Sequence, residues 1–116
     1  MGKLTWFEDN NVPVIVINES GIIVRVNSLF EQEFGWDGTD LKGQPVSAVI
    51  PPSLRDAHNM GFSRYLLSKE STVLNIPLDL EILTGSGQVV MAPHYITAVE
   101  RGEDVLFAAR IEVRQG

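Results

Sequence analysis

The stretch NESGIIVRVNSLF, residues 18–30, holds the signals that decide the fold. Its first four residues, 18–21, combine asparagine, serine and glycine, which are typical of a turn. They lie between two runs rich in β-branched residues, 14–17 and 22–26. Two short apolar runs around a four-residue turn that contains glycine predict a β-hairpin near the start of the chain.

Helical signals follow this hairpin. Ser28 and Glu31 have the spacing of a capping box, which predicts a helix that begins at Ser28 and ends at Gly35. Two single-turn elements are expected at 39–43 and 47–50, and a longer helix at 53–68. Apolar residues of the longer helix recur every three or four positions, so it presents one inward face.

Three strands are predicted after these helices. Residues 74–82 alternate apolar and polar side chains, with the even-numbered ones expected to face a core. A turn at 84–87 leads to a strand at 89–99, and a turn at 101–104 leads to an alternating strand at 105–113. The pattern predicts an α+β domain, in which a five-stranded antiparallel sheet carries several short helices and one longer helix on one face.

Composition narrows the class of protein. The chain has 116 residues, no cysteine and a formal net charge of -6. This length suits one domain, and we expect residues 1–11 to form an N-terminal cap and 12–116 the folded domain. The absence of cysteine excludes disulfides and thiolate metal sites, and the acidic balance argues against nucleic acid. With no apolar span or signal peptide, we expect a soluble, cytoplasmic domain without direct membrane contact.

The motifs resemble those of the PAS domain family. The resemblance spans roughly residues 12–115 and is carried by 18–30, by Phe34-Gly35-Trp36 with 41–46, and by the turn 84–87. It implies a sensory or regulatory domain that binds a small ligand or cofactor and signals through dimer contacts to an effector domain, as in two-component histidine kinases. No nucleophile elbow or phosphate loop occurs, so we do not expect an enzyme.

The predicted ligand site is an apolar pocket between the longer helix and the late strands. We expect its lining to comprise His58, Phe62, Leu66, Leu74, Ile76, Leu78, His94 and Ile96. The segment from Pro51 to Leu66 also resembles the helix of haem-binding PAS domains in oxygen-sensing histidine kinases. That resemblance implies an alternative function as a haem b gas or redox sensor, with His58 as the axial iron ligand and Arg64 beside a haem propionate.

Two further alternatives remain open at this stage. Ala92, His94 and Ile96 line the pocket if even positions face inward, but the odd face of that strand is equally apolar. The pocket could also be filled, which would leave a ligand-free dimerisation module. Trp6, Phe7 and the outer face of the late strands, with Met91 and Tyr95, form the expected homodimer surface.

Overall fold

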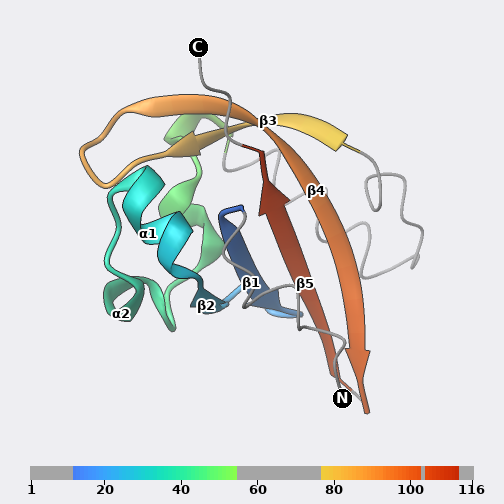
Figure 1. The fold of residues 1–116 in the computed structure, drawn as a ribbon. Helices are drawn as coiled ribbons and strands as arrows, with labels where there is room; N and C mark the ends of the chain where they lie inside the picture. Colours follow the sequence, from blue (N-terminus) through green and yellow to red (C-terminus); the bar gives the residue numbers. More distant parts are fainter. Residues whose placement is uncertain (1–11, 55–76, 103, 113–116) are drawn as a thin grey trace.

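An antiparallel sheet forms the framework of the protein. The structure, a computed structural model, describes residues 12–54, 77–102 and 104–112. The five strands are β1 (Val14–Asn18), β2 (Ile23–Val26), β3 (Pro77–Leu83), β4 (Val89–Arg101) and β5 (Asp104–Ile111). Their order is β2-β1-β5-β4-β3, and every pair is antiparallel. Because β1 pairs with β5, the first and last hairpins share one sheet, which confirms the predicted arrangement (Figure 1).

The helical elements lie together on one side of this sheet (Figure 1). They are α1 (Ser28–Phe34), α2 (Gly38–Leu41) and the 3-10 turns η2 (Val46–Val49) and η3 (Pro52–Leu54). The predicted end of the first helix is confirmed, because Gly35 adopts the left-handed conformation and its N–H bonds to the Glu31 carbonyl. Beyond η3, the predicted longer helix lies outside the described residues, as do the cap 1–11 and the strand positions 74–76.

One predicted cap and one predicted helix start are wrong by one residue. Asn27, not Ser28, caps α1, and its side chain accepts a hydrogen bond from the Phe30 N–H. The single-turn element predicted at 39–43 begins one residue earlier, at Gly38, because Asp37 caps α2 in the same way. In each case the residue that keeps extended backbone angles just before the helix supplies the cap, and an Asn or Asp side chain there reaches the unpaired N–H groups.

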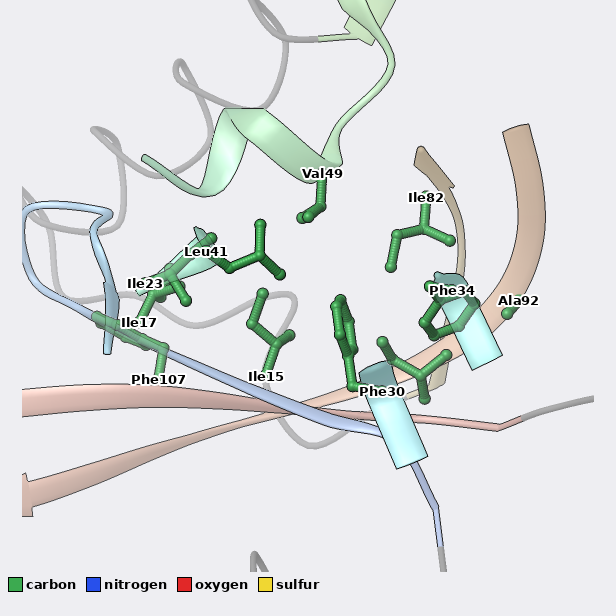
Figure 2. Packing of buried hydrophobic residues seen from close by; sticks show 11 residues of the cluster. Ile15, Ile17, Ile23, Phe30, Phe34, Leu41, Val49, Ile82, Ala92 and Phe107 are labelled. Atoms are coloured by element: carbon green, nitrogen blue, oxygen red, sulfur yellow. The ribbon is translucent and has the colours of Figure 1, made fainter. Parts of the chain in front are cut away.

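The main core lies between the helices and the sheet face that they cover, which is called the inner face below. Figure 2 shows side chains from β1, α1, η2 and β3 pointing toward a common interior. Phe30 and Phe34 meet edge to face there, with ring centroids 5.0 Å apart. The other buried members are Ile15, Ile17, Ile23, Leu41, Val49, Ile82, Ala92, Phe107 and Ile111. Burial of each large side chain stabilises the fold by about 1.5–3 kcal/mol.

The opposite, outer face is buried in the middle of the sheet and exposed at one side. Val14 and Val16 of β1 and Leu106 and Ala108 of β5 form a second buried cluster there. The last strand was predicted to alternate between an apolar and a polar face. In β5, however, Leu106, Phe107 and Ala108 are all buried, so both faces of the strand are covered at this point. On β4 the outer face is open, and Met91 is 59% exposed.

Candidate functional site

The inner face of β4 holds the candidate site. Side chains alternate along a strand, and Ala92 and His94 are buried while Met91 and Tyr95 are exposed. The even-numbered residues therefore face inward, which settles the orientation that the sequence left open. The register places His94 between Leu78 of β3 and Ile111 of β5, so the imidazole belongs to the middle of a three-stranded surface.

The residues around His94 on the inner face are apolar, and two of them are alanines. Ile96 pairs with Ala109, and Leu80 pairs with Ala92, so alanines stand beside larger side chains across this surface. Leu80 is 38% exposed although it shares a face with buried Ile82. Leu80 thus lies on the face predicted for the even-numbered residues of β3 but is only partly covered there, because alternation fixes the face of a side chain and not how well that face is covered.

The protonation of His94 follows from its burial and its hydrogen bond. The side chain is 8% exposed, and its Nδ1 lies 2.9 Å from the Ala92 carbonyl oxygen. A carbonyl oxygen only accepts, so Nδ1 carries the proton and Nε2 has a lone pair. Burial lowers the pKa of His94 below 6.5, and the hydrogen bond to Ala92 opposes this only in part. The ring is therefore neutral at pH values near 7.

An anchor at the tip of the β3–β4 hairpin sets the position of this surface relative to α1. The Trp36 indole Nε1 donates to the Leu83 carbonyl at 2.9 Å, and the Gly85 N–H donates to the Phe34 carbonyl at 2.9 Å. A Cβ atom on Gly85 would lie 2.0 Å from the Gly35 carbonyl oxygen, so only glycine fits. We call these contacts the hairpin anchor. The turn at 84–87 was predicted from its glycines, but its contact with α1 was not.

Asn27 joins the start of β1 to α1. Its Oδ1 accepts hydrogen bonds from the N–H groups of Val14 and Phe30, each at 3.0 Å, and its Nδ2 donates to the Val12 carbonyl at 2.8 Å. These bonds tie Asn27 to the backbone at the change from strand to helix. Because its amide is occupied in this way, Asn27 acts as a structural residue rather than a ligand contact.

The predicted site residues are placed only in part. His94 and Ile96 share the inner face, and the backbone of Leu78 lies beside His94. The side chain of Leu78 lies outside the described part of the chain, together with His58, Phe62, Arg64, Leu66, Leu74 and Ile76. The haem alternative depends on His58 and stays a prediction. Within residues 12–54, 77–102 and 104–112 there is no group of three or more metal-ligating side chains.

A cleft that was not anticipated from the sequence lies elsewhere in the described part of the chain. It is an open cleft of about 350 Å³ between the β1–β2 turn and the start of β5. It is lined by Asn18, Glu19, Ser20, Val24, Asp104, Val105 and Leu106. The Glu19 carboxylate at its wall accepts a hydrogen bond from the Val105 N–H at 3.2 Å, so this acid is already used within the fold. We therefore place the candidate site at His94 and not at this cleft.

Comparison with known proteins identifies the family. A family model described as the PAS fold matches residues 5–73, more than half of the chain, and this chain belongs to the PAS family. PAS domains are typically sensory, non-enzymatic modules that often sit in multidomain signalling proteins. No helix in the described residues is long and apolar enough to cross a membrane.

Three similar proteins illustrate the relationship. An uncharacterised protein of Azorhizobium caulinodans is 32% identical over 97 residues, which make up 83% of this chain and 13% of that protein. The PAS domain of a Desulfitobacterium hafniense protein superposes with a TM-score of 0.72 at 14% identity, covering 89% of this chain and 92% of that one. The PAS domain of the Cronobacter turicensis quorum-sensing receptor RpfR, in complex with C12:0, gives 0.66 at 17% identity, covering 90% and 95%.

Proposed function

We propose that this chain is the sensory domain of a longer signalling protein, and that it binds a small, mainly apolar ligand against the inner face of β3, β4 and β5. The observation that carries this proposal is the combination of a buried, neutral imidazole at His94 with the small residues Ala92 and Ala109 around it. Ligand sites in proteins are mostly apolar with a few placed polar groups, and this surface has that composition.

The size of the relative supports the place of the domain in a longer protein. The chain spans 13% of the Azorhizobium caulinodans protein, so that relative has ample length for an effector. A histidine kinase is the effector that we propose. Ligand occupancy would shift the sheet between two states because the ligand contacts them differently.

Dimer contacts are the proposed output of the domain. The outer face of β4 exposes Val89, Met91 and Tyr95. Exposed apolar and aromatic side chains are characteristic of protein interfaces, and we propose that two copies of the chain meet there.

Met91→Glu would place a charge in that interface, and sedimentation should then show a monomer where the unmodified chain forms a dimer. A dimer that persists unchanged would exclude this surface.

A bulky substitution tests the ligand site directly. Ala92→Phe fills the inner face, whereas Met91→Phe adds a ring to the outer face of the same strand. A probe with a chain of this length is suitable because a structurally similar PAS domain has been solved in complex with C12:0. In calorimetric titrations we expect 1-dodecanol to bind the unmodified chain and Met91→Phe but not Ala92→Phe, with circular dichroism showing that both variants fold. Equal binding by both variants, or no binding by any chain, would contradict the proposal.

The haem alternative is tested by an absorption spectrum after expression with haem supplied. A Soret band that disappears in His58→Ala would establish a haem sensor. A wild-type chain without that band would exclude haem. If native mass spectrometry shows no bound molecule and neither haem nor 1-dodecanol binds, the ligand-free dimerisation module is the better account.

A further inference from the structure

His94 is the one polar group among the described inner-face side chains of β3, β4 and β5. Antiparallel pairing puts it on the same face as Ala92, Ile96, Ala109 and Ile111, all of which are apolar. Within the described residues, the only hydrogen-bond partner of the imidazole is the Ala92 carbonyl, which holds Nδ1. Among the described inner-face side chains of these strands, a ligand therefore meets a single free polar atom, the Nε2 nitrogen.

The Nε2 atom can accept a hydrogen bond but cannot donate one. The Ala92 carbonyl fixes the proton on Nδ1, 2.9 Å away, so the lone pair remains on Nε2 at the other side of the ring. The ring cannot easily reverse these roles, because a proton on Nε2 alone would leave two acceptors, Nδ1 and the carbonyl oxygen, facing each other. A buried acceptor that has no partner among the described residues is unfavourable, so a ligand that supplies a donor gains affinity.

We propose, on the basis of the ligand site proposed above, that Nε2 of His94 selects apolar ligands whose polar end is a neutral hydrogen-bond donor, such as an alcohol. The hydroxyl hydrogen of the ligand bonds to Nε2 while its hydrocarbon part lies against Ala92, Ile96 and Ala109. A carboxylate is disfavoured because it, too, only accepts, and its negative oxygens would face the lone pair of Nε2. An ether is disfavoured less, because it lacks a donor but carries no charge.

Three probes with the same number of carbon atoms separate the effect of the hydrogen bond from the effect of charge. They are 1-dodecanol, its isomer methyl undecyl ether and C12:0, titrated calorimetrically into the whole chain at about pH 8, where the carboxyl group of C12:0 is ionised. We expect the alcohol to bind about 5- to 10-fold more tightly than the ether, the factor that one hydrogen bond supplies, and the carboxylate to bind no more tightly than the ether. Equal affinities, or tightest binding of the carboxylate, would overturn the proposal.

A variant assigns the preference to His94. His94→Phe keeps a flat ring but removes the acceptor, so the alcohol and the ether should bind it with equal affinity. If the preference for alcohol persists in this variant, His94 does not cause it and the proposal fails. If none of the probes binds the unmodified chain, the ligand site itself is wrong, whereas binding without preference overturns only the role of His94.

A measurement on the unmodified chain covers the case in which His94→Phe does not fold. Nitrogen-15 NMR of the two histidine rings distinguishes a protonated from an unprotonated nitrogen, and His58→Gln assigns the remaining signals to His94. We expect protonated Nδ1 and unprotonated Nε2, and a shift of the Nε2 signal when 1-dodecanol is added but not when the ether is added. A protonated Nε2, or an identical response to both probes, would overturn the proposal.

Discussion

Trp36 and Leu83 are joined by a hydrogen bond of 2.9 Å from the indole Nε1 to the carbonyl oxygen, although 47 positions separate them in the chain. This bond connects the segment after α1 to the end of β3, and the Gly85–Phe34 bond lies next to it. Two of the three strands that carry the candidate site, β3 and β4, are thereby held to α1 at the tip of their hairpin (Figure 1). The shape of the proposed ligand surface thus depends on residues that do not belong to it.

Replacement of Trp36 by phenylalanine should weaken the hairpin anchor. The variant leaves the Leu83 carbonyl without its donor, and we expect the free energy of unfolding to fall by about 1–3 kcal/mol. Urea denaturation measures this change. Tyr95→Phe is the matched control, because Tyr95 lies on the open outer face, and it should change stability by about 0.5 kcal/mol or less. Equal losses in both variants would show that the indole bond contributes nothing specific.

Replacement of Gly85 by alanine tests the same anchor through backbone contact. The new Cβ would collide with the Gly35 carbonyl oxygen, a backbone atom that cannot rotate away. We expect a loss of about 1–3 kcal/mol in unfolding free energy, together with weaker ligand binding because the hairpin must move. Gln88→Ala is the control, because Gln88 directly follows the turn and its side chain is exposed. Unchanged stability of Gly85→Ala would mean that the turn does not rest on α1.

Replacement of Asn27 by alanine removes three hydrogen bonds at once. Two N–H groups and one carbonyl lose their partner in a buried position, so a loss of about 2–4 kcal/mol is expected. Asn18→Ala is the comparison, since Asn18 accepts bonds from the N–H groups of Ser20 and Ile22 near the surface. Water can replace those bonds. In urea denaturation, Asn18→Ala should therefore lose clearly less unfolding free energy than Asn27→Ala. The reverse order would contradict the role assigned to Asn27.

Acid should destabilise the protein through His94. The pKa of His94 is lowered in the folded state, so the unfolded chain binds the proton more readily. The stability that the neutral ring provides is complete above pH 6.5 and is lost as the pH falls from 6.5 through the lower folded-state value. Unfolding free energies at about pH 8 and about pH 5 should therefore differ more for the unmodified chain than for His94→Phe. An equal or smaller difference would contradict the buried, neutral state.

Local signals in the sequence predicted most elements of the fold. The turn at 18–21 and the stop at Gly35 follow from neighbouring residues alone, and the structure confirms both. The cap was predicted at Ser28 but lies at Asn27, because both residue types can cap a helix and the sequence does not show which of them keeps extended backbone angles. The additional bond of Asn27 to Val14, 13 residues away, depends on the folded arrangement and leaves no local pattern.

The candidate site was predictable to a similar extent. The alternating pattern of residues 89–99 left two possible orientations for His94, inward or outward. The structure shows that His94 is buried and therefore points inward. The position of the proton on Nδ1 depends on the Ala92 carbonyl, and the hairpin anchor depends on Trp36 reaching Leu83. Both are backbone contacts, and side-chain patterns in a sequence carry little information about backbone acceptors.

Methyl NMR during a titration with 1-dodecanol tests the central claim most directly. Ile82, Ile96 and Ile111 have methyl groups on the inner face, and Met91 has one on the outer face. The account predicts saturable shifts of the three isoleucine signals while the Met91 signal stays in place. Shifts confined to Met91, or isoleucine signals unmoved at saturating alcohol, would contradict a ligand site on the inner face.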